Sequence, residues 1–293
     1  MWLLIANLAA CVEGRAAAPA PTTQPIPPTQ AETEAHLAAM HLPAGMHAVA
    51  RAPFVVIGNE PASTVEARAD GPLLRSAKLL RTQLFSTDLT DVWEVWLLAD
   101  AQSYERQTLT MFGVRADTPY GFANGPHHAM VMNIGLGGGT LIHELVHPYV
   151  HADFPEAPDW LNEGIASLYE QAAERNGRIT GYPNWRLAGL HHGITTGSAL
   201  SLRALIQSHD DFYTRQGDPY AVARYLCFYL QEHDLLETFY RAFRAGWHAD
   251  PSGWNTLQTT LGNPDPSQFQ RDWEAWVMHL AYDPRHPFGH DGV

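Results

Sequence analysis

Short apolar runs and helically spaced apolar residues divide most of the chain into predicted strands and helices. Continuous apolar runs at 53–58, 92–98 and 129–133 predict buried strands. Apolar residues at helical spacing in 73–85 and 103–112 predict helices between those strands. The predicted sheet therefore precedes the long helices of the second half, an order typical of an α+β fold.

The second half of the chain carries mostly helical patterns. Asp218 is a plausible N-cap for a helix whose first residue is Pro219. Amphipathic patterns predict further helices at 235–245 and 266–282, and a short one at 201–207. Glycines punctuate 176–218, which predicts a loop-rich passage that contains His191 and His192.

These patterns predict one folded unit with two closely packed parts. We expect a domain over residues 31–282, with the sheet and the first long helix in 31–155 and a helical subdomain in 156–282. Residues 283–293 are predicted to form a mobile tail.

The N-terminal segment predicts export. Residues 1–11 hold an apolar run that is too short to span a bilayer and that ends in Leu8-Ala9-Ala10-Cys11, which resembles the lipobox of bacterial lipoproteins. Residues 12–30 are rich in Ala, Pro and Thr and predict an extended tether. We expect a protein of the bacterial cell envelope whose membrane contact is a lipid on Cys11. A signal peptide cleaved without lipidation is the alternative.

Charge and cysteine content limit the binding partners and the disulfides that can be expected. The formal net charge of −13 argues against nucleic acid and anionic membrane surfaces as binding partners. Only two cysteines are present, and the partner of Cys227 would be the predicted anchor Cys11, so no intrachain disulfide is expected. The sequence does not indicate an oligomeric state.

The stretch His143-Glu144-Leu145-Val146-His147 carries the strongest chemical signal. On a helix, residues four apart share a face, so both imidazoles can reach one Zn²⁺ ion. Glu144 lies beside the pair and can accept a proton from the water on that ion. Two surface histidines on an ordinary helix are the alternative. Gly137-Gly138-Gly139 and the N-cap candidate Thr140 favour a helix start just before His143.

A third ligand is expected from a second helical segment, Trp160 to Glu170. Glu163 would complete a site of two histidines and one carboxylate. Asp153 and His151 are rivals, but Val150 lacks the backbone freedom that a turn back to the metal needs. Pro148 lacks an amide hydrogen, so we expect the helix to kink or end near this residue.

His143-Glu144-x-x-His147 followed by Trp160-Leu161-Asn162-Glu163-Gly164 resembles the gluzincin zinc metallopeptidases, the group of thermolysin and aminopeptidase N. Glu163 follows His147 by 16 residues, a shorter spacing than those two families use. The chain is therefore most similar to the compact bacterial branch of the superfamily, the peptidase MA-like proteins. The resemblance implies a thermolysin-like α+β catalytic unit with one zinc ion.

The resemblance also implies roles for residues outside the motif. Glu170 matches an acidic position that can orient a ligand histidine. Tyr220 matches a tyrosine that donates its hydroxyl to the oxyanion, with Tyr225 as the fallback. The last strand before the metal helix is implied to be an edge strand that pairs with the substrate, and it comprises Ala129, Met130, Val131, Met132 and Asn133.

These observations predict a zinc-dependent metallopeptidase that hydrolyses peptide bonds, with Glu144 as the general base. The aminopeptidase motif that grips a free amine has no acidic counterpart at Gly135 to Gly139, so an endopeptidase is expected. An envelope-tethered binding or scaffold protein with little turnover is the first alternative. A zinc hydrolase of a non-peptide substrate is the second.

Overall fold

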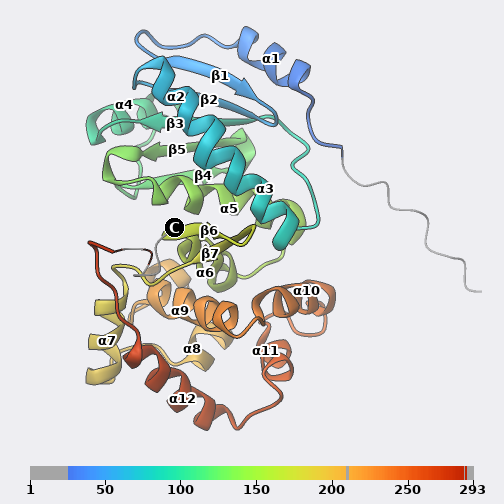
Figure 1. Ribbon diagram of the computed structural model, residues 1–293, viewed down its shortest axis with the longest axis vertical. Helices are drawn as coiled ribbons and strands as arrows, with labels where there is room; N and C mark the ends of the chain where they lie inside the picture. Colours follow the sequence, from blue (N-terminus) through green and yellow to red (C-terminus); the bar gives the residue numbers. More distant parts are fainter. Residues whose placement is uncertain (1–25, 209–210, 287, 289–293) are drawn as a thin grey trace, which may run out of the picture.

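The protein has a sheet half and a helical half, one above the other (Figure 1). A computed structural model describes residues 26–208, 211–286 and 288. The predicted export segment and most of the predicted tether lie outside these residues, as do 287 and 289–293 of the predicted tail. No helix in the described part has both the length and the apolar character needed to cross a membrane.

A five-stranded mixed sheet forms the first half. Its strands are β1 (His47–Arg51), β2 (Phe54–Gly58), β3 (Trp93–Leu98), β4 (Gly121–Asn124) and β5 (Ala129–Asn133), in the order β1-β2-β3-β5-β4. β2, β3 and β5 run parallel, while β1 and β4 are antiparallel edge strands. The three central strands are apolar throughout most of their length because both faces of the sheet are covered.

Helices cover the two faces of this sheet. One face packs on α2 (Ala62–Arg68), a π-helical turn at Ala69–Leu73, α3 (Leu74–Gln83) and α5 (Gly139–Asp153). The other face packs on α1 (Gln30–Ala39) and α4 (Ala101–Phe112). Successive side chains of a strand point to opposite faces of the sheet. Val56 of β2 therefore faces α2 and α3, while Val55 and Ile57 face α4.

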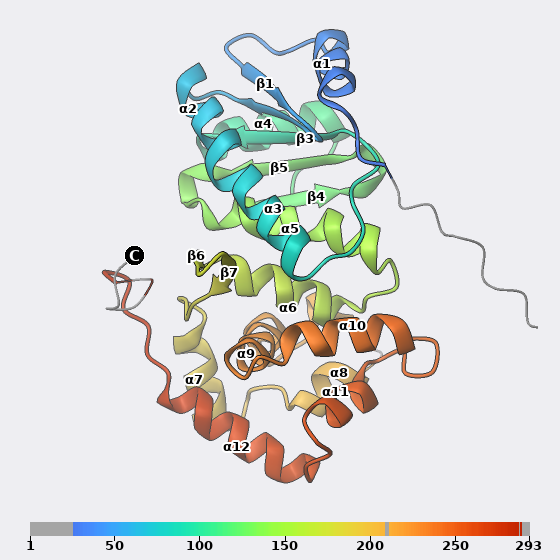
Figure 2. The same cartoon turned by 45° about the vertical axis from the view of Figure 1, so that its right-hand side comes forward.

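The helical half begins with α6 (Asp159–Tyr169), which lies against α5 at the boundary between the halves (Figure 2). A two-stranded hairpin follows, β6 (Ala172–Arg175) and β7 (Arg178–Gly181). The remaining helices are α7 (Leu187–Thr196), α8 (Leu202–Gln207), α9 (Pro219–Glu232), α10 (Leu236–Gly246), α11 (Trp254–Thr260) and α12 (Pro266–His279).

Gly164 allows α6 and α9 to cross closely. A Cβ atom at this position would lie 2.9 Å from the Cys227 sulfur and 3.1 Å from the Ala223 carbonyl oxygen. Cys227 is buried in this contact, where it packs as a small core residue. The close crossing fixes α6 firmly, and α6 carries the predicted third ligand.

Glutamine side chains form hydrogen bonds with the outer backbone groups of two edge strands. On β7, Gln83 bonds both the amide and the carbonyl of Ile179, at 3.0 and 3.3 Å. Gln231 does the same at Gly181, at 2.8 and 3.0 Å. On β1, Gln30 bonds the Ala50 carbonyl at 3.1 Å and the Ala52 amide at 3.0 Å. Each amide group continues the strand ladder for one step.

Several sequence predictions differ from the structure. α5 continues through Pro148 to Asp153, so of the expected kink or end near the proline, the end does not occur. His191 and His192 lie on α7 rather than in a loop. The strands β1, β4, β6 and β7 were not predicted. The three predicted strands and the helix that begins at Pro219 with Asp218 as its N-cap are confirmed.

Candidate metal centre

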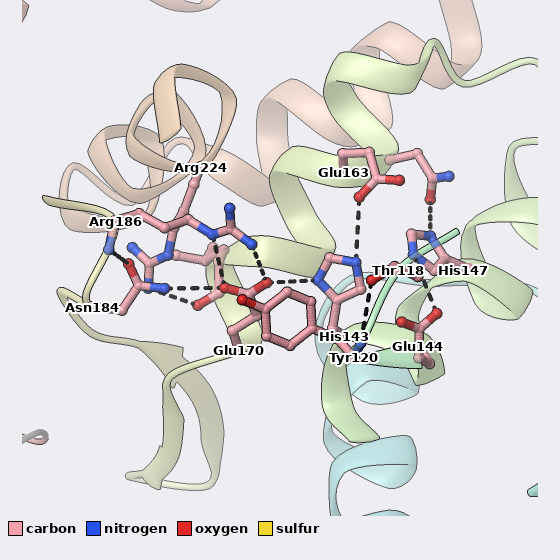
Figure 3. A network of polar contacts seen from close by, with 12 residues as sticks. Thr118, Tyr120, His143, Glu144, His147, Glu163, Glu170, Asn184, Arg186 and Arg224 are labelled. Carbon is pink, nitrogen blue, oxygen red and sulfur yellow. Dashed lines mark hydrogen bonds and ion pairs between the residues drawn. The ribbon is translucent and has the colours of Figure 1, made fainter. Parts of the chain in front are cut away.

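His143, His147 and Glu163 come together where α5 meets α6 (Figure 3). The two imidazoles lie one helical turn apart on α5, with their ring centroids separated by 5.0 Å. The Nε2 atom of His143 is 3.3 Å from the Oε2 atom of Glu163. One nitrogen or oxygen of each residue lies within 4.8 Å of the others, so the three can hold a metal ion.

Local sequence explains how the two helices meet. Residues 154–158 form a short connection, closed by a hydrogen bond from the Ala157 amide to the Phe154 carbonyl. This accounts for the 16-residue spacing between His147 and Glu163. At the other end, α5 begins at Gly139, where a Cβ atom would overlap the Glu170 carbonyl oxygen. Glycine there lets the start of α5 approach the end of α6.

Each histidine has an oxygen partner at its second ring nitrogen. Nδ1 of His143 lies 3.1 Å from Glu170 Oε1, and Nδ1 of His147 lies 3.0 Å from Asn162 Oδ1. Partners of this kind hold the proton on Nδ1 and direct the Nε2 lone pair outward. Both Nε2 atoms are then available as ligands on the same side of α5.

Glu170 is itself held by residues that precede α7. Arg186 donates two hydrogen bonds to its carboxylate, at 2.7 and 3.0 Å, and Asn184 donates a third at 3.1 Å. Burial alone would raise the pKa of Glu170, but its contacts with His143 and Arg186 outweigh burial and lower the pKa to about 2. The carboxylate therefore stays ionised beside His143.

The centre has a negative potential that favours a cation. Burial opposes protonation of His143, yet its contacts with Glu163 and Glu170 raise its pKa to about 10. Burial also acts against ionisation of Glu163, but its contact with His143 and the charge of His147 outweigh burial and lower its pKa. A proton on His143 or a metal ion between the three side chains would neutralise the same excess of negative charge.

A buried and unpaired ligand atom supports the fit to a metal. Glu163 Oε2 is buried and accepts no well-aligned hydrogen bond from the described residues. Buried polar atoms without a hydrogen-bond partner are rare unless an ion or a water molecule binds them. Two imidazole nitrogens and one carboxylate oxygen suit Zn²⁺ with one position left open. The residues present therefore fit one zinc ion.

Glu144 lies beside the ligands without joining them. Its Oε2 atom is 3.8 Å from Nε2 of His147, and the side chain is buried. Burial is the largest cause of a raised pKa at Glu144, which the neighbouring histidines only partly oppose. A carboxylate with a raised pKa is a stronger proton acceptor than an ordinary one.

The centre opens into a cleft of about 1970 Å³ between the two halves. β4, the glycines before α5, the β6–β7 hairpin and the segment before α7 contribute to its walls. Five exposed apolar side chains line it, which are Tyr120, Leu136, Trp185, Tyr213 and Phe288. This space is large enough for several residues of an extended polypeptide.

The predicted substrate strand was placed wrongly. Ala129, Met130, Val131, Met132 and Asn133 form β5, which is buried and pairs with β3 on one side and β4 on the other. β4 is the edge strand, and Gly121 and Ala123 line the cleft. The apolar run correctly predicted a strand, but it held no information about the strand order.

The other predicted residues divide into those that face the cleft and those that do not. Tyr220 lines the cleft, and its ring lies 5.2 Å from the Arg186 guanidinium carbon. The fallback Tyr225 is buried, and its hydroxyl bonds the backbone of Asn184. The exposed rival His151 lines the cleft rim. The rival Asp153 is buried and bonds Ser86 and Tyr240 instead.

The sequence patterns did not predict the contacts that three residues make in the centre. Asn162 was named only as part of the motif, and no role was predicted for Arg186 or Tyr213. Tyr213 donates its hydroxyl to Glu163 Oε1 at 3.2 Å. Asn162 is adjacent to Glu163 in the sequence, and this position beside a predicted ligand could have indicated its role. Arg186 and Tyr213 lie on other elements, and no sequence period connects them to the motif.

Comparison with known proteins adds no assignment. Neither a scan against models of protein families nor a search of curated proteins finds a match for this chain.

Proposed function

We propose that this protein is a zinc-dependent metallopeptidase of the gluzincin type, with a thermolysin-like catalytic unit. The observation that carries the proposal is the convergence of His143, His147 and Glu163 beside the buried Glu144, in a cleft bordered by an edge strand. The mixed sheet, the helix beneath it that carries both histidines and the helical half below support the α+β arrangement that the proposal requires.

His143, His147 and Glu163 would hold the ion, with Glu170 and Asn162 fixing the two rings. When bound, Zn²⁺ polarises the scissile carbonyl and lowers the pKa of the attacking water. Glu144 accepts the proton of that water and later delivers it to the leaving amine. Its buried position and raised pKa suit both transfers.

The substrate would pair with β4 rather than with β5. The Asn133 amide donates to the Tyr120 carbonyl, so alternation turns the backbone groups of Gly121 and Ala123 away from β5. Among the described residues, none bonds those backbone groups. An extended peptide can add to this edge as a further strand, which places its backbone along the metal centre.

Tyr220 would stabilise the oxyanion that forms on the scissile carbonyl. Its ring is fixed by an edge contact with Phe212, with centroids 5.0 Å apart, and by the Arg186 guanidinium. Burial and the nearby Glu163 carboxylate raise the pKa of Tyr220, so its hydroxyl stays protonated as a donor.

The test combines metal analysis with hydrolysis of a mixed peptide library. We expect the wild type and Glu144→Gln to bind one zinc ion each, while the substitution reduces the cleavage rate by about 10²- to 10⁴-fold. The exposed Glu105, on α4, provides the matched control, because Glu105→Gln changes the same chemical group far from the cleft.

Equal cleavage by wild type and Glu144→Gln would exclude the proposed mechanism. Zinc binding without cleavage by any form would favour the alternative of a tethered binding or scaffold protein. Absence of zinc from the wild type would remove the metal site altogether.

A further inference from the structure

Tyr213 reaches the metal centre from a segment far along the chain. It lies on a 3-10 turn, Phe212–Thr214, 50 residues after Glu163, and its hydroxyl donates to Glu163 Oε1 at 3.2 Å. The Asp211 side chain accepts from the Tyr213 amide at 3.0 Å and closes the turn. The buried Phe212 anchors it by an edge contact with Tyr220.

The two oxygens of Glu163 have different surroundings. Oε1 accepts the hydrogen bond from Tyr213, whereas Oε2 lies 3.3 Å from His143 Nε2 and is buried without a well-aligned hydrogen bond from the described residues. A carboxylate can bind a cation through one oxygen or through both. A donor on one oxygen favours binding through the other, because the bonded lone pair is already engaged.

We propose that Tyr213 is a positioning residue that holds Glu163 as a one-oxygen metal ligand. Its hydroxyl engages Oε1 and leaves Oε2 for the ion, so that a second carboxylate oxygen does not fill the position that the substrate needs. The inference rests on the proposed metal site. It adds a role for a residue that lies outside both sequence motifs and on a different element from the ligands.

Tyr213 and Tyr220 offer a matched comparison. Both rings line the cleft and both contact Phe212, with centroids 5.5 and 5.0 Å from it. Only Tyr213 of the two hydrogen-bonds a ligand carboxylate among the described residues. Removal of the hydroxyl should therefore affect the metal at position 213 and leave it unaffected at position 220.

The experiment uses the full chain and measures Zn²⁺ affinity by competition with a chromogenic chelator. Tyr213→Phe should weaken Zn²⁺ binding by about tenfold or more, while Tyr220→Phe binds as the wild type does. The second measurement is the visible spectrum of the Co²⁺-substituted protein. We expect a weaker ligand-field band in Tyr213→Phe, because a carboxylate bound through both oxygens raises the coordination number.

Tyr213→Leu, which also removes the ring, should lose the same affinity as Tyr213→Phe if the hydroxyl carries the effect. A much larger loss in Tyr213→Leu would instead assign the effect to packing and overturn the inference. Wild-type Zn²⁺ affinity and an unchanged Co²⁺ spectrum in Tyr213→Phe would overturn it too. A wild type that binds Zn²⁺ but cleaves no peptide would refute only the peptidase activity, and one that binds no Zn²⁺ would refute both.

Discussion

Asp153 and Glu163 are two buried carboxylates near the junction of α5 and α6, and their partners give them different roles. Glu163 faces two histidines and keeps one oxygen without a hydrogen bond from the described residues. Asp153 accepts from the Ser86 amide and hydroxyl at 2.9 and 2.8 Å and from the Tyr240 hydroxyl at 3.1 Å. Its lone pairs are thus engaged by groups that join α5 to α10 and to the segment after α3, which is a structural role.

We therefore predict that Asp153→Asn reduces the free energy of unfolding by about 2 kcal/mol and leaves Zn²⁺ affinity unchanged. Chemical denaturation followed by circular dichroism measures the first quantity, and chelator competition the second. A stable variant with weakened Zn²⁺ binding would instead place Asp153 at the metal.

The same residue gives a pH dependence with a defined sign. Burial would raise the pKa of Asp153, but hydrogen bonds from Thr87 and Ser86 and the charge of Arg244 lower it below its usual value. A lowered folded-state pKa stabilises the protein above the unfolded-state pKa of about 4, and this contribution is lost as the pH falls through the folded-state value. Between neutral and acidic pH, the stability of Asp153→Asn should fall less than that of the wild type.

At this scale the sequence is informative where a period or a motif connects the residues. His143 and His147 are four apart on one helix, and Glu170 follows Glu163 by seven, so helical geometry alone places each pair on one face. Arg186 and Tyr213 reach the centre because separate elements fold over it. Tertiary contacts of that kind leave no regular spacing in the sequence.

At the scale of elements, β4 and β5 show what pattern reasoning can and cannot supply. The apolar run of β5 correctly predicted a buried strand because parallel central strands are covered on both faces. β4 has only four residues, begins with a glycine and is partly buried, so its signal is weak. The order of strands depends on the connections between them, and the family resemblance implied the wrong edge strand.

Backbone pairing along β4 can be tested with proline. Ala123→Pro removes an amide that points away from β5, so we expect the protein to fold and its KM for extended peptides to rise about tenfold or more. Ala48→Pro is the matched control. The backbone groups of Ala48 point away from β2, as do those of Ala50 two residues later, whose carbonyl accepts a hydrogen bond from Gln30. Steady-state kinetics on a cleaved peptide would show equal KM values for both variants if β4 had no part in binding.

At the scale of the whole molecule, the candidate metal centre joins the two halves. His143 and His147 lie on a helix that packs under the sheet, while Glu163 lies on the first helix of the other half. The presence of a sheet followed by long helices was readable from the sequence, and the mixed helical and strand content is consistent with the α+β class. The hairpin between the halves was missed because Ala172–Arg175 has neither an apolar run nor β-branched residues.

A ligand set shared between the halves predicts that metal stabilises the folded chain. At a free Zn²⁺ concentration of about 1,000 times Kd, binding adds about 4 kcal/mol to the free energy of unfolding. We expect removal of metal by a chelator to lower the melting temperature of the wild type, as followed by calorimetry. Glu163→Gln should show a much smaller shift, and equal shifts for the two proteins would argue against Glu163 as a ligand.

The glutamine side chains at the strand edges also bear on the behaviour of the protein in a crowded solution. Free strand edges invite pairing between copies of a chain and lead to aggregation. Gln83 and Gln231 occupy the outer backbone groups of β7, and Gln30 occupies two at the end of β1. The open backbone groups of β4 border the cleft between the two halves instead, which an extended polypeptide can enter more easily than a second folded copy of the chain. Protection from self-association and selection for unfolded chains would thus have the same structural origin.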